Sequence, residues 1–203
     1  MARIVLGLDA EQRKEQRKTA LLDAALELFS SLGYSSTSIE QLCHGAGIST
    51  KSFYGIFADR EQCYLALMHR SAAALLERMN RALKEAPDDE DSGSEKLISA
   101  LAHAFGDDRR RAIVLFGYGS AFTPIIEVER RRNRQIAEAF LLQVWQRYRP
   151  GYLPAAGMPT GVIGGLFAII SGWASSEMQP SAPDVQHLHL ALHNFYRSVR
   201  LPA

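Results

Sequence analysis

The architecture of this chain can be predicted from the stretch TSIEQLCHGAGISTKSFYGIF, residues 37–57. It contains two short runs with helical periodicity, one before Gly47 and one beginning at Ser49. The T-x-x-E pattern that starts at Thr37 predicts a capping box for the first helix. Gly47 is suited to end that helix, and Ser49 is suited to cap the next one. Two short helices joined by a turn of three or four residues with a glycine are the layout of a helix-turn-helix, here at about 38–57.

A longer helix is predicted on each side of this stretch. Residues 11–32 carry an apolar face, and Gly33 follows as a C-terminal cap. That face consists of Leu22, Ala25, Leu26, Phe29 and Leu32. Asp59 and Gln62 repeat the capping pattern and open a long helix. Its apolar stripe consists of Tyr64, Leu67, Met68, Leu75, Met79 and Leu83. The acidic segment 85–93 then predicts a solvated linker.

Four or five further helices are predicted in the remainder of the chain, and no segment alternates as a strand would. The candidates run over residues 94–105, 108–116, 124–149, 159–176 and 183–199. Three of them begin at prolines, which suit the first turn of a helix. The predicted fold class is therefore all-α. We expect an N-terminal domain over residues 1–74 and a C-terminal helical domain over residues 75–203, joined by the long helix.

Composition limits the function classes. The chain has 203 residues, of which 47% are hydrophobic, so it is long enough to bury a core. Its net charge is +1, so nucleic-acid binding would need a local basic patch. Cys43 and Cys63 are the only cysteines, and small buried hydrophobes are the favoured interpretation of both. The uncharged and largely apolar stretch 158–176 favours a buried or dimer-forming helix over a membrane span. We therefore expect a cytoplasmic protein without a membrane partner.

The second short helix has the surface chemistry expected of a helix that enters a DNA major groove. Its leading residues are hydroxyl-bearing side chains and one cation. They are Ser49, Thr50, Lys51 and Ser52. Hydroxyls bind phosphate or base edges, and a lysine reaches the acceptors of guanine. Phe53 and Phe57, four residues apart, are expected to point back into the domain.

Basic residues flank this helix. Arg13, Lys14, Arg17 and Lys18 crowd the start of the first predicted helix. Arg60 lies in the first turn of the long helix, which is an unfavourable place for a cation unless an anion is near. A DNA phosphate would be such an anion, and contacts of this kind make binding salt-dependent.

At this point the chain resembles the tetracycline-repressor-like (TetR/AcrR) family of regulators over about residues 14–74. The resemblance rests on Ala24-Ala25 to Phe29, Gly33-Tyr34, Thr37-Ser38-Ile39, Ala46-Gly47-Ile48-Ser49, Phe53-Tyr54, Phe57 and Asp59-Arg60-Glu61. It implies a three-helix DNA-binding domain joined by a long fourth helix to a ligand-binding and dimerisation domain. It also implies a homodimer that binds palindromic operator DNA, usually as a repressor that a small-molecule ligand releases. The last two long helices would form a four-helix bundle across the dimer.

The resemblance assigns roles to individual positions. Thr37 and Ser38 match phosphate contacts at the start of the second helix. Thr50, Lys51 and Ser52 match base-reading positions. Tyr54 matches a phosphate or thymine-methyl contact, and Arg60 stands where the family usually has lysine. Gly55 and Ile56 depart from the family pattern, which implies one phosphate contact fewer.

Beyond about residue 75 the predictions rest on helical pattern alone. A largely apolar effector cavity would be lined by aromatic side chains. The candidates are Phe105, Phe116, Tyr118, Phe122, Phe140, Trp145, Phe167 and Trp173. Small residues spaced three or four apart predict a close dimer contact by the helix over 159–176, together with the last helix. The candidates are Gly161, Gly165, Ala168, Gly172, Leu188, Leu192 and Phe195.

Other residue types carry weaker signals. His187, His189 and His193 have no obvious acidic or cysteine partner, so surface or interface histidines are favoured over a metal site. The arginine run over 130–134 favours a solvated face, with a second nucleic-acid surface or pairing to the acidic segment at 88–91 as alternatives. No nucleophile–base set, phosphate loop or metal pair is evident, so no enzyme, cofactor or metal is expected. The alternative to a DNA-binding regulator is a helical binding protein that uses the helix-turn-helix only structurally.

Overall fold

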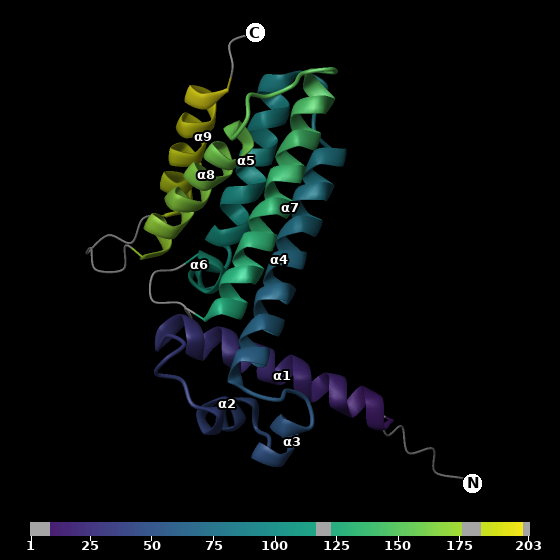
Figure 1. Ribbon diagram of the computed structural model, residues 1–203, viewed down its shortest axis with the longest axis vertical. Coiled ribbons are helices and arrows are strands. Elements are labelled where there is room, and N and C mark those ends of the chain that lie inside the picture. The colour runs from purple at the N-terminus through teal and green to yellow at the C-terminus, as the bar shows by residue number, and fades with distance from the viewer. Residues whose placement is uncertain (1–8, 117–122, 176–183, 201–203) are drawn as a thin grey trace. The chain divides into compact units, whose positions relative to one another are not determined.

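A computed structural model describes residues 9–116, 123–175 and 184–200. Within these residues the chain forms nine α-helices and no β-strand, as predicted (Figure 1). The chain divides into two compact units, Met1–Leu67 and Met68–Ala203. The division falls within α4, which runs over Arg60–Lys84. Each unit is described by itself.

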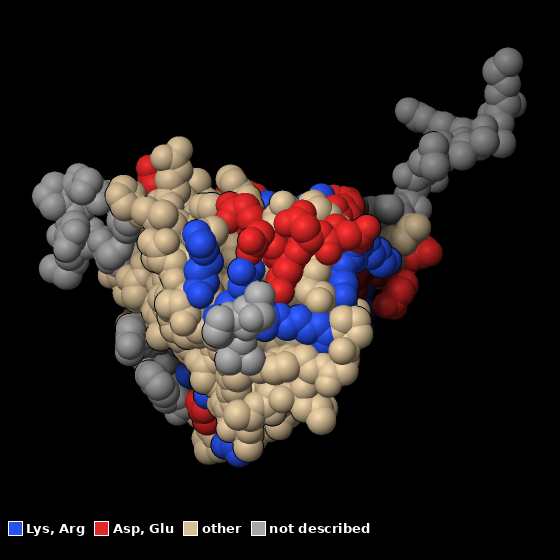
Figure 2. Space-filling model, turned by 90° about the horizontal axis from the view of Figure 1, so that it is seen from above, with Lys and Arg blue, Asp and Glu red and all other residues tan. Residues whose placement is uncertain are grey.

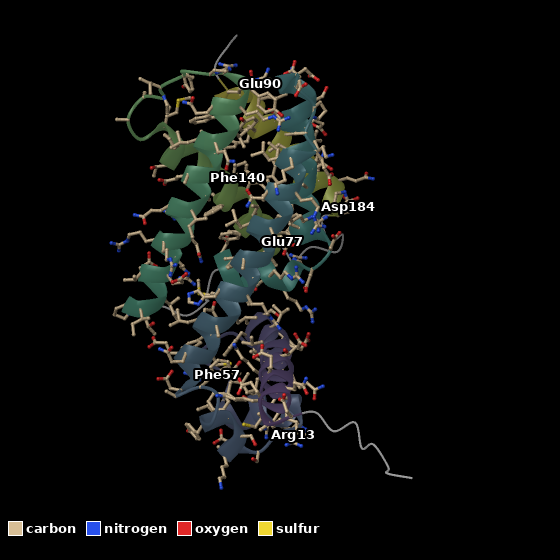
Figure 3. All side chains as sticks on the ribbon, turned by 90° about the vertical axis from the view of Figure 1, so that its right-hand side faces the viewer. Arg13, Phe57, Glu77, Glu90, Phe140 and Asp184 are labelled. Carbon is tan, nitrogen blue, oxygen red and sulfur yellow. The ribbon has the colours of Figure 1, made fainter. Side chains whose placement is uncertain are left out.

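The N-terminal unit consists of α1 (Ala10–Ser31), α2 (Ile39–Ala46), α3 (Thr50–Tyr54) and the start of α4. The bounds match the predicted helices to within a residue or two. One apolar core is shared by all four segments. The most deeply buried members are Leu21, Ala25, Phe29, Leu42, Phe53, Cys63, Tyr64 and Leu67. Both cysteines are reduced and buried, as predicted, and burial raises the pKa of the Cys43 thiol. Figure 3 labels Phe57, which is also buried here.

The start of α2 differs in detail from the prediction. Ser38, one residue after Thr37, is the N-cap, and its side chain accepts a hydrogen bond from the Gln41 backbone amide at 3.2 Å. The Gln41 side chain accepts from the Ser38 amide in return, so the capping box is Ser38–Gln41 and the predicted Thr37–Glu40 pairing is wrong. The end of α2 follows the prediction, because Gly47 adopts the left-handed conformation with φ of 64°.

The C-terminal unit contains the rest of α4 and five helices that follow it. These are α5 (Glu90–Gly106), α6 (Arg109–Phe116), α7 (Pro124–Tyr148), α8 (Met158–Ser175) and α9 (Val185–Val199). The start predicted at Pro183 lies outside the described residues. The linker predicted over 85–93 is shorter than expected, because Asp89 caps α5 by accepting from the Ser92 amide. Gly93 is buried inside α5, where a Cβ would clash with Tyr148.

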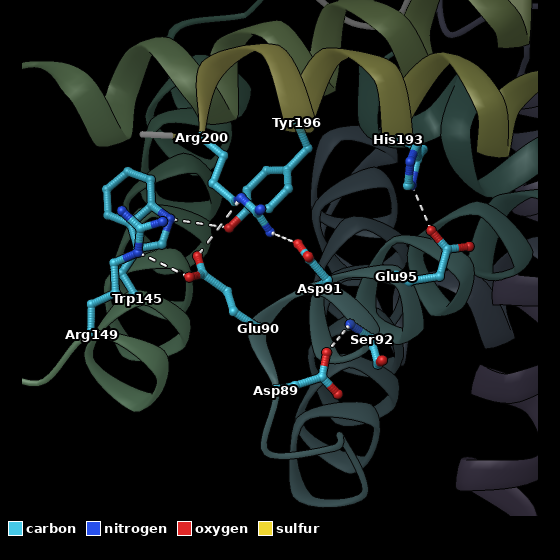
Figure 4. Close-up of polar contacts among 10 residues, drawn as sticks. All are labelled: Asp89, Glu90, Asp91, Ser92, Glu95, Trp145, Arg149, His193, Tyr196 and Arg200. Atoms are coloured by element: carbon cyan, nitrogen blue, oxygen red, sulfur yellow. Dashed lines mark hydrogen bonds and ion pairs between the residues drawn. The ribbon is translucent and has the colours of Figure 1, made fainter. Parts of the chain in front are cut away.

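The acidic residues of that segment hold helix ends together. Glu90 pairs with Arg149 at 3.0 Å and with Arg200 at 4.0 Å, and Arg200 also pairs with Asp91 (Figure 4). Figure 2 shows carboxylates and basic side chains side by side on one face of the molecule. These ion pairs tie the start of α5 to the C-terminal ends of α7 and α9, so the segment is a structural connection and not merely a solvated linker.

Two predictions about charged clusters need correction. Glu95 of α5 lies 2.8 Å from His189 and pairs also with His193, so these histidines do have an acidic partner (Figure 4). Nevertheless, no group of three or more metal-ligating side chains is placed to hold a metal in the described part of the chain. The arginine run of α7 pairs with carboxylates of its own helix, Arg130 with Glu127 and Arg132 with Glu129, and not with the acidic segment at 88–91.

Candidate nucleic-acid interface and ligand cavity

Helix α3 presents a polar surface that its own packing keeps outward. Phe53 is fully buried, which fixes the rotation of this five-residue helix. Thr50, Lys51 and Tyr54 are therefore exposed, and Tyr54 has 56% of its surface accessible. The Tyr54 ring packs edge-on against Phe53 at 5.5 Å, so its body is supported while its hydroxyl end faces outward. This surface has the donors that a major-groove contact requires.

The serines around α3 position its backbone. Ser49 caps the helix by accepting from the Ser52 amide at 3.2 Å, and the two hydroxyls lie 3.0 Å apart. Both hydroxyls are therefore already engaged in local hydrogen bonds, although Ser49 is exposed and Ser52 is half-buried. Ser38 plays the same capping role for α2. The three serines thus have structural roles, and their hydroxyls keep lone pairs or protons for a second contact.

Thr37 and Arg60 have internal partners that the sequence did not reveal. Thr37 is fully buried, and its hydroxyl donates to the Gly33 carbonyl at 2.8 Å. Its burial contradicts the predicted phosphate contact. The Arg60 guanidinium donates to the Thr37 carbonyl and stacks over the Tyr34 ring at 4.4 Å. The positive charge of Arg60 at the start of α4 therefore has partners within the protein and does not require a DNA phosphate.

In the described part of the N-terminal unit, the other lysine and arginine side chains lie on α1. Arg13, Lys14 and Arg17 are exposed, as Figure 3 shows for Arg13, and Lys18 lies 3.8 Å from Glu15. On α2, hydrogen bonds from its own backbone amide and from Ser38 lower the pKa of the Glu40 carboxyl. Glu40 is thus ionised at neutral pH, which suits the positive end of the α2 dipole.

The C-terminal unit contains a cavity of about 680 Å³. This volume falls within the range of about 300–1,000 Å³ that is typical of small-molecule sites. Its walls come from α4, α5, α6, α7, α8 and α9, and apolar side chains predominate. The wall includes Leu76, Met79, Leu97, Ile98, Phe140 and Val144. Polar side chains line it too, mainly His69, Glu129, Arg130, Asn133 and Arg134.

Three of the eight aromatic residues predicted to line a cavity do so: Phe116, Phe140 and Phe167. Phe116 and Phe167 pack together with ring centroids 4.4 Å apart. Phe105 is instead buried in the core behind Phe116, with 1% of its surface accessible. Tyr118 and Phe122 lie outside the described residues.

The two tryptophans serve as structural contacts and do not line the cavity. The Trp145 indole donates to the Tyr196 hydroxyl at 3.1 Å, and burial raises the pKa of Tyr196 (Figure 4). Trp173 lies under the Arg109 guanidinium, 5.2 Å from its ring centroid. Arg109 also donates to the Trp173 carbonyl, so this part of α8 is anchored to α6.

The N-terminal part of the chain matches a known protein family. Residues 21–67 match the family described as "Bacterial regulatory proteins, tetR family". This match relates the N-terminal unit of the chain to the tetR family. The matched segment begins within α1, covers α2 and α3, and ends at Leu67, where the N-terminal compact unit also ends.

Curated regulators match about half of this chain. The transcriptional activator FasR of Mycolicibacterium smegmatis is 29% identical over 94 residues, which are 46% of this chain and 41% of FasR. The fatty acid metabolism regulator protein of Bacillus subtilis is 24% identical over 106 residues, 51% of this chain and 53% of that protein. The chain thus spans about half the length of the curated relatives it matches.

Solved structures share the fold over nearly the whole chain. FadR from Bacillus halodurans, a fatty acid degradation regulator, superposes with a TM-score of 0.73 at 15% identity, over 88% of this chain and 93% of FadR. FadR from Bacillus subtilis, solved in complex with stearoyl-CoA, superposes with a TM-score of 0.70 at 19% identity, over 90% of this chain and 99% of that one. At these identities the likeness establishes the all-helical fold.

The residues predicted to form a dimer contact divide into three groups. Leu188 and Leu192 are buried within the protomer, with 1% and 0% of their surface accessible, so they cannot form an interface. Gly165 receives the Phe195 ring of α9, because a Cβ there would clash with that ring. Gly161, Ala168 and Gly172 are exposed along one side of α8. Of the three groups, this last one is the most accessible to a partner.

Sequence reasoning missed the polar residues of the cavity, and a signal for them exists. Arg130, Asn133, Ala137, Phe140 and Val144 recur every three or four residues along α7, which places them on one helix face. This face is polar in its first half and apolar in its second half. The arginine run is predicted from sequence to face solvent as a block, whereas one side of it lines the cavity.

Proposed function

We propose that this chain is a transcriptional regulator that binds operator DNA through α2 and α3 as a homodimer. We further propose that a small, largely apolar effector in the C-terminal cavity releases it from DNA. The observation that carries the proposal is the exposed face of α3. This helix offers Thr50, Lys51 and Tyr54 to a groove, while the buried Phe53 holds it rigidly on the core. The tetR-family match over the same residues supports it.

The DNA contacts are assigned from exposure. Thr50 and Lys51 read base edges, since both are exposed near the start of α3. Tyr54 contacts a phosphate or a thymine methyl group. Phosphates are contacted by the serine hydroxyls, which can still donate a hydrogen bond. These serines are Ser38, Ser49 and Ser52. Arg60 acts mainly by holding the turn before α2 through the Thr37 carbonyl, so its influence on DNA passes through the position of that turn.

The functional division of the chain follows the compact units. The cavity is lined by His69, Ala72 and Ala73, all of which precede the boundary expected after residue 74. We therefore assign DNA binding to residues 1–67 and effector binding to residues 68–203. An effector is proposed because the cavity has the size and polarity of a ligand site, and because B. subtilis FadR, which shares the fold, was solved with stearoyl-CoA.

The homodimer is proposed to form along the exposed side of α8. Gly161, Ala168 and Gly172 permit a close helix approach, and the exposed Leu190 of α9 adds apolar surface. Among the described helices, α8 alone is long and apolar enough to cross a membrane, with a third of that window buried in the unit. A second copy of α8 packed on this face would cover its exposed apolar surface. A regulator of this kind acts in the cytoplasm.

Binding of the full-length protein to genomic DNA fragments at two salt concentrations tests the proposal. Wild type should form a sequence-preferring complex that weakens steeply as salt rises, because each phosphate contact releases counterions. Lys51→Ala should lower the preference for the bound sequence, at a cost of about 1–3 kcal/mol. Lys84→Ala, which removes the same charge from the C-terminal unit, is the matched control and should bind as wild type does. A chain that forms no salt-sensitive complex would instead be a helical binding protein.

A further inference from the structure

The two ends of the cavity differ in chemistry. At one end, His69 of α4 lies 3.1 Å from Glu129 of α7, and Asn133 lies one turn further along α7. The Asn133 amide nitrogen is buried and has no hydrogen-bond partner within the described residues. A buried donor of this kind is costly unless a ligand or water satisfies it. This end is therefore built to receive a hydrogen-bond acceptor.

The other end of the cavity is apolar. Met79, Leu97, Phe140 and Val144 pack there as parts of one hydrophobic cluster, and Figure 3 shows Phe140 on α7. Ser94 and Tyr196 are the polar side chains that α5 and α9 add to the described lining. The Tyr196 hydroxyl is already engaged by Trp145, and the buried Ser94 hydroxyl, which has no hydrogen-bond partner among the described residues, is the one polar group left at this otherwise apolar end. A ligand would bury an apolar portion at this end.

The distance between the two ends follows from the helix that lines them both. From Glu129 to Val144, α7 advances fifteen residues, which at 1.5 Å per residue is about 22 Å. Helix α4 follows the same wall from His69 to Met79, about 15 Å. The cavity is therefore long in one direction, and a ligand that fills it is elongated.

The charge at the polar end has a definite sign. The lining includes three arginines, Arg130, Arg132 and Arg134, against one carboxylate, Glu129. Glu129 is paired with Arg132 at 3.8 Å, and Arg130 pairs at 3.9 Å with Glu127, a residue outside the lining. The excess is positive, and an arginine guanidinium is suited to carboxylate and phosphate groups. A cationic head group would meet repulsion there.

We propose that the cavity binds a long-chain amphiphile with an anionic head group. The alkyl chain of the ligand lies along α7 toward Phe140 and Val144. Its head group is held by Asn133, Arg130 and Arg134. The inference rests on the proposed function only in treating the cavity as the effector site. It is tested on the protein without DNA, so its failure and the failure of DNA binding are separate results.

Calorimetry of the intact protein with four ligands of one chain length tests the head group. The ligands are dodecanoate, dodecyl phosphate, dodecanol and dodecyltrimethylammonium, each kept below micelle formation at low salt. The two anions should bind at least about fivefold more tightly than the alcohol, and the cation most weakly. The ratio of dodecanoate to dodecyl phosphate distinguishes a carboxylate head from a phosphate head. Equal binding of the alcohol and both anions, or tighter binding of the cation, overturns the proposal.

Chain length and variants locate the ligand. Hexanoate should bind more than about a hundredfold more weakly than dodecanoate, because each buried methylene adds affinity. Asn133→Leu and Arg134→Gln should reduce the preference for anions over dodecanol while leaving dodecanol binding unchanged. Arg131→Gln is the control, since Arg131 is exposed on the same helix but does not line the cavity.

A variant that blocks the cavity tests where the alkyl chain of the ligand lies. Ala137→Trp should fill the middle of the cavity and abolish binding of every twelve-carbon ligand, with its helical content verified by circular dichroism. Unchanged dodecanoate binding by a folded Ala137→Trp protein would contradict the location. So would an equal loss of anion preference in Arg131→Gln and Arg134→Gln.

Discussion

The proposed DNA-binding surface and the cavity are assembled in different ways. In the N-terminal unit, the contact residues come from positions 38–54, and each is positioned by a cap or a buried neighbour within a few residues. In the C-terminal unit, the cavity takes its wall from six helices, α4 to α9, and residues as distant as His69 and Tyr196 line it. The first surface is fixed by local interactions, and the second by packing between distant segments.

This difference explains which functional residues a single sequence reveals. Caps and turns leave signatures at fixed spacing, so the Ser49 cap and the Gly47 turn are recognisable in the sequence itself. A cavity is a space that several helices leave unfilled, and no spacing within one helix specifies it. Substitutions in the two units test this contrast.

The largest effect should come from the residue that orients α3. Phe53→Ala removes a fully buried aromatic ring and should lower the free energy of unfolding by about 3–5 kcal/mol. Tyr54→Ala changes the adjacent, exposed aromatic side chain and should cost well under about 1 kcal/mol while weakening DNA binding. Urea denaturation of both variants measures the difference. If the two substitutions were equally destabilising, the buried and exposed roles assigned to these neighbours would be wrong.

Much of the fold was predictable, and the errors have physical causes. The helix bounds followed from periodicity, because amphipathic faces and caps are local features. A threonine before a helix usually caps it and remains accessible, whereas here Ser38 caps α2 and Thr37 turns inward to Gly33. The choice between two adjacent hydroxyl residues depends on the core packing, which the sequence does not display.

In the C-terminal unit the misassignments involve partners far away in the chain. Glu90 forms ion pairs with Arg149 and Arg200. The acidic segment 85–93, which was predicted to be a linker, therefore contains the start of α5. Trp145 was expected in the cavity, but it donates to Tyr196, 51 residues away. Such pairings are decided by tertiary packing, and no local pattern marks either partner.

A second prediction tests this dependence on distant contacts. A Cβ at Gly106, the last residue of α5, would overlap Val185 Cγ2 and lie 2.8 Å from Val185 Cβ at the start of α9. Gly106→Ala should therefore destabilise the C-terminal unit by about 1–3 kcal/mol through overpacking. Gly164→Ala in α8, where a Cβ meets nothing within 4 Å, should be neutral or slightly stabilising in a helix. Thermal unfolding of the pair provides the comparison, and equal melting temperatures would argue against close packing of α5 on α9.

The smallest effect concerns an exposed ion pair of the C-terminal unit. The hydrogen bond from Arg78 to Asp107, 2.8 Å long, lowers the pKa of the Asp107 carboxyl below its ordinary value of about 3.9. Because the folded-state pKa is lower than the unfolded one, the stabilisation is present above about pH 4 and is lost as the pH falls through the folded-state pKa. Solvent screening should keep it below about 0.5 kcal/mol.

The free energy of unfolding of wild type and Arg78→Gln at about pH 7 and about pH 3 measures this contribution. The difference between the two proteins should be largest at the higher pH and shrink at the lower one. A difference that grows on acidification would contradict the assigned sign.

Selection of DNA by the full-length protein from a random-sequence pool tests whether α3 is the recognition helix of a dimeric regulator. Such a dimer should enrich a two-fold symmetric sequence whose half-sites lie about one helical turn, roughly 34 Å, apart or a multiple of that distance. The Lys51→Ala protein should enrich the same arrangement with relaxed choice at the bases that this lysine reads. A pool without enriched sequence, or an enriched sequence without symmetry, would contradict the role proposed for α3.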